Sequence, residues 1–71
     1  MKKISFEHWE LQFGEDHNCV IRDRSSGWEN YNWQWFNIKD GHIQWEDYPS
    51  FPCSPKCKEY FSRIVRMKAF L

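Results

Sequence analysis

The sequence predicts an α+β fold, a small antiparallel β-meander of three or four strands with one C-terminal amphipathic helix packed on one face. A hairpin signal surrounds Asp40-Gly41, a helical repeat follows Ser54-Pro55, and 41% of residues are hydrophobic and 20% aromatic, as in a folded chain. A chain of 71 residues makes a single domain. Its expected parts are a sheet over about residues 9–48, a linker over 49–54 and a helix over about 55–69.

The strongest local prediction is a β-hairpin that turns at Asp40-Gly41. Both residues tolerate the positive φ angles of a two-residue type I′ turn, and segments rich in aromatic residues flank them over 31–38 and 43–48. A two-residue loop fixes the register of the strands. The predicted pairs are Lys39 with His42, Ile38 with Ile43, Phe36 with Trp45, Trp35 with Glu46, and Trp33 with Tyr48.

Alternation of side chains gives this hairpin two different faces. The face predicted to be core carries Phe36, Ile38, Ile43 and Trp45. The other face is aromatic but rimmed by polar groups such as Glu46, and its rings are Tyr31, Trp33, Trp35 and Tyr48. Because one helix covers only one face, either the N-terminal segment or a binding partner covers the aromatic face.

The predicted helix begins after Ser54, an N-cap residue, with Pro55 at the first helical position, where its missing N–H costs nothing. Apolar residues then recur at steps of three and four, and polar residues fall opposite them. The apolar set is Cys57, Tyr60, Phe61, Ile64, Met67 and Leu71, and the polar set is Lys56, Glu59, Ser62, Arg63 and Arg66.

The first third of the chain allows two interpretations. Alternating Trp9, Leu11 and Phe13 predict a strand, which a loop over 14–18 connects to a second strand over 19–23. In the alternative, Ser5 caps a short helix that ends at Gly14. We favour the strands.

Length and charge narrow the class of function. Seventy-one residues leave little room for a catalytic pocket beside a core, and no glycine-rich nucleophile elbow or phosphate-binding loop is present, so we expect no enzyme. Residues 1–51 carry nine acids against five bases, and residues 52–71 carry five bases against one acid. An odd number of cysteines, no N-terminal signal peptide and no apolar run of about 20 residues favour a cytoplasmic protein without a membrane partner.

Histidine and cysteine suggest two zinc arrangements, although we expect no metal and no other cofactor. One would use His17, Cys19, Cys53 and Cys57, and its alternative is that the cysteines are small buried hydrophobic residues. In the other, His8-Trp-Glu10 and Pro52-Cys53-Ser-Pro-Lys-Cys57 resemble the zinc-deaminase pattern. This resemblance implies that His8, Cys53 and Cys57 bind zinc and that Glu10 transfers protons. Three residues separate the cysteines here, against two in the family.

A further resemblance concerns the aromatic segments. Gly27-Trp28-Glu29, Trp35-Phe36-Asn37 and Gln44-Trp45-Glu46-Asp47 resemble parts of a WW domain, a three-stranded module that grips proline-rich peptides. The two tryptophans are closer together in the sequence than in that family. What the resemblance implies here is an aromatic sheet face that binds another protein.

We therefore expect a protein-binding module whose contact residues are Tyr31, Trp33, Trp35, Tyr48 and Glu46, since Trp and Tyr are frequent binding hot spots. In size and composition the chain resembles the small inhibitors that bacteriophages and mobile elements make against host enzymes and defence systems, including anti-CRISPR proteins. The alternative is a protein that binds single-stranded nucleic acid by aromatic stacking. Its phosphate contacts would be Lys56, Arg63 and Arg66, because the sheet offers only Arg22, Arg24 and Lys39 as cations.

Overall fold

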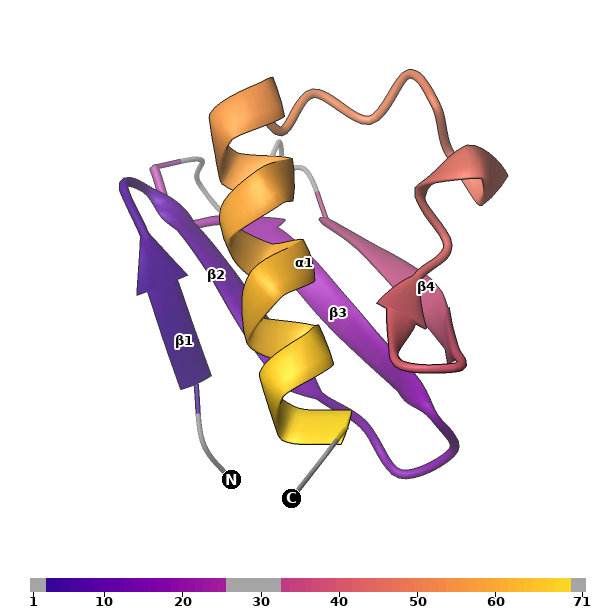
Figure 1. Cartoon of the computed structure of the whole chain (residues 1–71). Coiled ribbons are helices and arrows are strands. Elements are labelled where there is room, and N and C mark those ends of the chain that lie inside the picture. The colour runs from indigo at the N-terminus through magenta and orange to yellow at the C-terminus, as the bar shows by residue number, and fades with distance from the viewer. Residues whose placement is uncertain (1–2, 26–32, 70–71) are drawn as a thin grey trace.

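The computed structural model describes residues 3–25 and 33–69, which form one antiparallel sheet and one long helix (Figure 1). Five strands follow one another in the sheet in the order of the chain, and the helix crosses one face of the sheet. The α+β meander is thereby confirmed, with five strands in place of three or four. The elements are β1 (Lys3–Phe6), β2 (Trp9–Phe13), β3 (Asn18–Asp23), β4 (Trp33–Lys39), β5 (His42–Ile43), a 3-10 turn η1 (Trp45–Asp47) and α1 (Pro55–Ala69).

The N-terminal third is built of strands, so the alternative helix from Ser5 is wrong. β2 and β3 lie where the alternating pattern predicts them, and β3 pairs with both β2 and β4. The unexpected element is β1, which pairs with β2 and places Ile4 opposite Leu11. Its turn uses Glu7 at a φ of 55°. No glycine or asparagine marks this turn, and the sequence pattern therefore did not indicate the strand.

The hairpin turn at Asp40-Gly41 is confirmed, with φ angles of 53° and 79°. The pairs Ile38 with Ile43 and Lys39 with His42 are also confirmed. Beyond Ile43 the chain leaves the sheet and forms η1, so three predicted pairs are wrong: Phe36 with Trp45, Trp35 with Glu46, and Trp33 with Tyr48.

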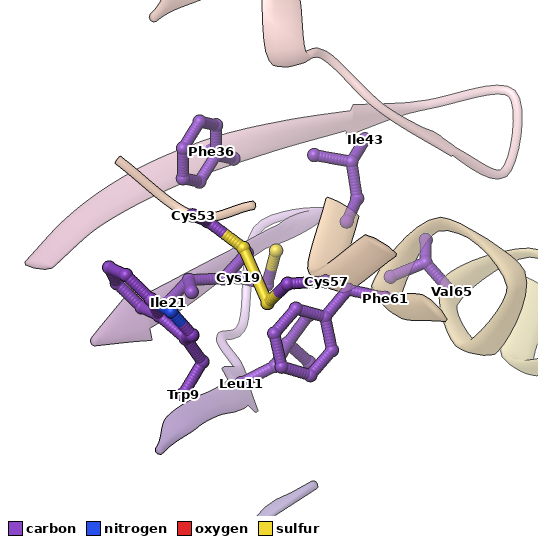
Figure 2. Packing of buried hydrophobic residues seen from close by; sticks show 10 residues of the cluster. All are labelled: Trp9, Leu11, Cys19, Ile21, Phe36, Ile43, Cys53, Cys57, Phe61 and Val65. Atoms are coloured by element: carbon purple, nitrogen blue, oxygen red, sulfur yellow. A yellow bond between two sulfur atoms is a disulfide. The ribbon is translucent and has the colours of Figure 1, made fainter. Parts of the chain in front are cut away.

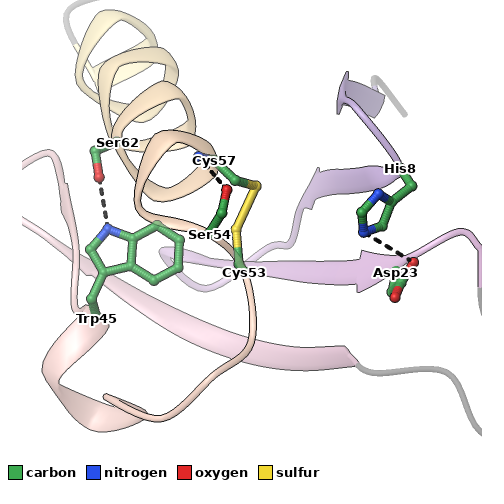
Figure 3. Close-up of a disulfide and its surroundings, with 7 residues drawn as sticks. All are labelled: His8, Asp23, Trp45, Cys53, Ser54, Cys57 and Ser62. Carbon is green, nitrogen blue, oxygen red and sulfur yellow. Dashed lines mark hydrogen bonds and ion pairs between the residues drawn. A yellow bond between two sulfur atoms is a disulfide. The ribbon is translucent and has the colours of Figure 1, made fainter.

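The departure of η1 from the sheet brings Trp45 to the helix. Its indole Nε1–H donates a hydrogen bond to Ser62 Oγ on α1 at 2.7 Å (Figure 3). The ring still contacts Phe36, with 4.9 Å between ring centroids. Trp45 is therefore half-buried and packs against the core, while its polar bond links helix and sheet in a way that a regular strand pair would not.

Helix α1 spans the predicted residues, Pro55 to Ala69. Ser54 caps it, because its Oγ accepts the N–H of Cys57 at 3.2 Å and its carbonyl accepts the N–H of Lys58 at 2.9 Å. Leu71, the last predicted apolar residue, lies outside the described residues.

The core lies between α1 and the sheet face that it covers (Figure 2). Each strand contributes alternate residues, and the helix contributes those at three- and four-residue steps. Phe6 of the outer strand stacks on Tyr60, with 4.8 Å between ring centroids. The buried apolar residues are Trp9, Leu11, Cys19, Ile21, Phe36, Ile43, Cys53, Cys57, Phe61 and Val65.

All three cysteines belong to this core. Cys53 and Cys57 form a disulfide across the start of α1 (Figure 3), which the odd cysteine count did not predict. Cys19 is a free, fully buried thiol, and burial raises its pKa to about 12. The thiol is therefore un-ionised at neutral pH and behaves as a small apolar side chain.

Candidate partner-binding face

The sheet face opposite α1, called here the open face, carries the alternate residues that the core does not use. The strand registers place Arg22 beside Trp33 and Val20 beside Trp35. On the next strand, Glu10 lies beside Arg22. The open face thus combines two tryptophans with an array of charged and polar side chains.

Trp33 and Trp35 are the large rings of the open face. Their exposed fractions are 47% and 45%, whereas Phe36, the next residue after Trp35, is 1% exposed on the covered side. Two residues along a strand correspond to about 7 Å, so the rings stand as close neighbours. Together they leave a substantial apolar area on the surface of a small domain.

Gly14 leaves room for the ring of Trp35. A Cβ atom at this position would collide with Asn18 Oδ1 and would lie 2.8 Å from Cζ3 of Trp35. The N–H of Gly14 donates to the carbonyl of Asn18 at 2.9 Å, which holds the loop between β2 and β3 close to the ring. Trp35 therefore rests on backbone, and a side chain at residue 14 would push it away.

A charged cluster lies on the open face beside Trp33. Glu10 is only 8% exposed, and both Nε and Nη2 of Arg22 lie 2.9 Å from its Oε1 atom. Arg24 Nε lies 3.9 Å from the Oε2 atom, and Arg24 Nη1 donates to Ser5 Oγ at 3.5 Å. Two guanidinium groups thus surround one carboxylate, which leaves one net positive charge in the cluster.

A shallow pocket of about 200 Å³ opens over this cluster. Small-molecule sites usually enclose about 300–1,000 Å³, so this pocket suits a single side chain better than a metabolite. It is lined by Glu10, Gln12, Val20, Arg22 and Trp33.

The opposite end of the open face carries charges of both signs. Trp35 lies against Gly14, and the next two residues of that loop, Glu15 and Asp16, are exposed. The exposed residues Lys3, in the same row of paired strands as Trp35, and Lys39, on the same side of β4, offset these acids. The face therefore has paired arginines at one end and mixed charges at the other, without a continuous basic track.

The predicted contact residues do not all belong to the open face. Trp33 and Trp35 do, whereas Tyr31 lies outside the described residues. Tyr48 follows η1, and its ring packs edge-on against Phe36 with 5.6 Å between centroids, on the covered side. Glu46 is exposed within η1. The prediction grouped Tyr48 and Glu46 with the tryptophans because it extended the second hairpin strand too far.

The predicted phosphate contacts lie on the other side of the molecule. Lys56, Arg63 and Arg66 are exposed on α1, which covers the face opposite the two tryptophans (Figure 1). Arg63 Nη2 also donates to Glu59 Oε1 at 3.3 Å. The sheet separates these cations from the stacking rings.

The structure does not bring the candidate zinc ligands together. Cys53 and Cys57 are bonded to each other, Cys19 is buried in the core, and His17 is exposed in a loop. Among residues 3–25 and 33–69, no three His, Cys, Asp or Glu side chains are grouped to hold a metal ion.

The zinc-deaminase arrangement does not form either. His8 Nε2 lies 3.8 Å from Asp23 Oδ1 (Figure 3), and Arg22 holds the carboxylate of Glu10. The segment that resembles a WW domain also differs from that family. Trp45 and its neighbours form η1 instead of a third strand, and Trp28 lies outside the described residues.

The contacts among Glu10, Arg22 and Arg24 are the part of the face that the sequence did not indicate. Because side chains alternate along β2, Glu10 lies on the open face, whereas its neighbours Trp9 and Leu11 lie on the covered face. The register of β2 against β3 then pairs it with Arg22, and no turn signal fixes that register.

Comparison with protein-family models, with curated proteins and with solved structures found no match to this chain. Within the described residues, no helix has both the length and the apolar character needed to cross a bilayer.

Proposed function

We propose that this protein is a non-catalytic protein-binding module whose contact surface is the open face around Trp33 and Trp35. One observation carries the proposal: both rings are nearly half exposed on the sheet face that α1 leaves uncovered. Both rings lie on β4, which pairs with β3 along the tryptophans and with β5 at its end. The backbone that carries the rings is therefore ordered before a partner binds. Such pre-organisation lowers the entropic cost of binding.

The energetics favour these two residues as anchors. Truncation of a tryptophan at the centre of a protein interface commonly costs about 2 kcal/mol or more, which is about thirtyfold in affinity. The surrounding Gln12, Val20 and Arg22 would form the mixed rim that excludes water from such anchors.

A protein partner fits the charge distribution better than single-stranded nucleic acid does. Nucleic acid needs cations along its whole path beside the stacking rings. Here Arg22 lies near Trp33, whereas the exposed acids Glu15 and Asp16 follow Gly14 beside Trp35 and offset the nearby lysines. The basic residues of α1 are on the opposite side, so the cations form no continuous path beside the rings.

As a biological role, we propose inhibition of a host enzyme or defence system in the cytoplasm. A single exposed face on a small domain is sufficient for an inhibitor that acts by blocking a surface, since such inhibition requires no catalytic group. A cytoplasmic location implies exposure of the disulfide between Cys53 and Cys57 to a reducing environment. The bond is buried, and this slows its attack by external thiols.

Affinity capture with matched variants tests this function. Wild type, Trp33→Ala, Trp35→Ala and Met67→Ala serve as baits in a bacterial lysate with and without nuclease treatment, and each is first shown to be folded by circular dichroism. Met67 is the control because it is 60% exposed but lies on α1. We expect wild type and Met67→Ala to retain the same proteins and both tryptophan variants to lose them.

Two results would contradict the proposal. Folded tryptophan variants that retain the same proteins at unchanged affinity would exclude the open face. Capture that disappears with nuclease treatment, and is weakened by Lys56→Gln and Arg66→Gln, would favour the nucleic-acid alternative.

A further inference from the structure

We infer that the open face recognises an acidic segment of its partner, with a partner carboxylate bound by Arg22 and Arg24 and an adjacent apolar side chain seated beside Trp33. This inference rests on the proposed protein-binding function and specifies the chemistry of the partner. It combines three features of one small area: the arginine cluster, the pocket and the exposed indole.

The buried carboxylate of Glu10 prepares the arginines for an anion. Its Oε1 atom accepts from two nitrogens of Arg22, which fixes that guanidinium at the floor of the pocket. The side chains of Arg22 and Arg24 are still 47% and 55% exposed. A guanidinium group has five N–H donors, so a held arginine keeps donors for an incoming carboxylate.

Arg24 is the cation whose position favours an external ligand. Its contacts with Glu10 and Ser5 are long, at 3.9 Å and 3.5 Å. Charge-assisted hydrogen bonds between guanidinium and carboxylate are typically about 2.7–2.9 Å. A partner carboxylate can therefore form shorter bonds with Arg24 than those it makes within the domain.

The pocket determines which kind of partner side chain can lie next to the carboxylate. Val20 and the ring of Trp33 form apolar walls around a volume of about 200 Å³. That volume holds a leucine, proline or phenylalanine side chain and excludes most larger ligands. At the Trp35 end, the exposed acids Glu15 and Asp16 offset the exposed Lys3 and Lys39, so the net positive charge that attracts a carboxylate is at the arginine end.

The test is selection of peptides from a random dodecapeptide library on the immobilised full chain. The baits are wild type, Arg24→Gln and, as a matched control, Arg66→Gln, an exposed arginine on α1, and the selected peptides are also measured against Trp33→Ala and Trp35→Ala. We expect wild type and Arg66→Gln to enrich peptides with Asp or Glu next to an aliphatic or aromatic residue. The selected peptides should bind Arg24→Gln about tenfold more weakly, because a charge-assisted hydrogen bond is lost.

The outcomes distinguish this inference from the proposed function. Peptides that need Trp33 but show no acidic enrichment, or that bind Arg24→Gln unchanged, would overturn the acidic partner and leave the protein-binding face intact. If no selected peptide depends on Trp33 or Trp35, both proposals fail. A labelled twelve-nucleotide oligothymidylate that binds wild type and is weakened by both Trp33→Ala and Arg24→Gln would overturn both in favour of nucleic acid.

Discussion

The two faces of the sheet use the same residue type in opposite ways. On the covered face, Trp9 is 4% exposed, and the indole of Trp45 is bonded to the helix through Ser62. On the open face, Trp33 and Trp35 are nearly half exposed beside arginine and glutamine. Tryptophan content alone therefore does not distinguish a core from a binding surface in a domain this small. The element that lies over each ring makes the distinction.

The largest loss of stability is expected from a substitution on the covered face. Trp9→Ala should destabilise the domain by about 3–5 kcal/mol, because it removes a buried ring and leaves a cavity. A domain of 71 residues has about 4–10 kcal/mol in total, so this variant has little structure left. Urea denaturation followed by circular dichroism measures the loss.

Trp9→Phe keeps an aromatic ring against Phe51 and provides a graded second measurement if Trp9→Ala does not fold. We expect it to lose about 1–2 kcal/mol, since part of the ring contact remains. A loss below half a kcal/mol for both variants would mean that the covered face is not the core.

The next effect concerns the attachment of the helix to the covered face. Reduction of the bond between Cys53 and Cys57 should lower the free energy of unfolding by about 2 kcal/mol, the magnitude for a loop closed over four residues of separation. The measurement is the urea midpoint with and without a phosphine reductant. The double variant Cys53→Ser/Cys57→Ser is the control, because reductant should leave its midpoint unchanged. An unchanged midpoint for wild type would contradict a stabilising role.

A smaller effect is expected from the same substitution on the open side. Trp35→Ala should cost about 1 kcal/mol, since its ring is only about half buried and its removal leaves no enclosed cavity. The comparison with Trp9→Ala in the same denaturation assay sharpens the contrast between the faces. If both variants lose the same free energy, Trp35 is part of the core and the open face is not available for a partner.

The smallest effect is expected from loss of the hydrogen bond that links η1 to α1. Ser62→Ala removes the acceptor of the Trp45 indole and should cost about 0.5–1 kcal/mol, because water reaches this half-buried donor. Ser50→Ala, at an exposed position in the linker, should change stability by less than half a kcal/mol. Equal values for the two variants would show that the bond contributes nothing.

The sequence predicted the elements with strong local signals. Asp40-Gly41 specifies its turn by its own φ preferences, and Ser54-Pro55 specifies the start of α1 by capping, so both predictions hold to the residue. The core side of β4 was also predicted, because alternation alone assigns Phe36 and Ile38 to one face.

The remaining features depend on contacts between distant segments. β5 ends after Ile43, and Trp45 then bonds to Ser62, which lies 17 residues further along the chain. Likewise, Glu10 meets Arg22 only once the register of two strands is set. For this reason only part of the candidate site was predicted: its two rings follow from alternation along one strand, whereas its charged cluster requires the register of β2 against β3.

The alternation within β4 has a consequence for engineering. Trp33 and Trp35 occupy positions whose side chains the core does not use, and Val20 and Arg22 occupy the same kind of position on β3. Random replacement of Trp33, Trp35 and Val20 should therefore yield folded variants with new specificities, provided that Gly14 is kept and that Arg22 still pairs with the buried carboxylate of Glu10. Insertion or deletion of one residue in β4 would do the opposite, since it would turn the tryptophans inward and Phe36 outward. The domain can thus serve as a scaffold that tolerates substitution across one face and no change in strand length.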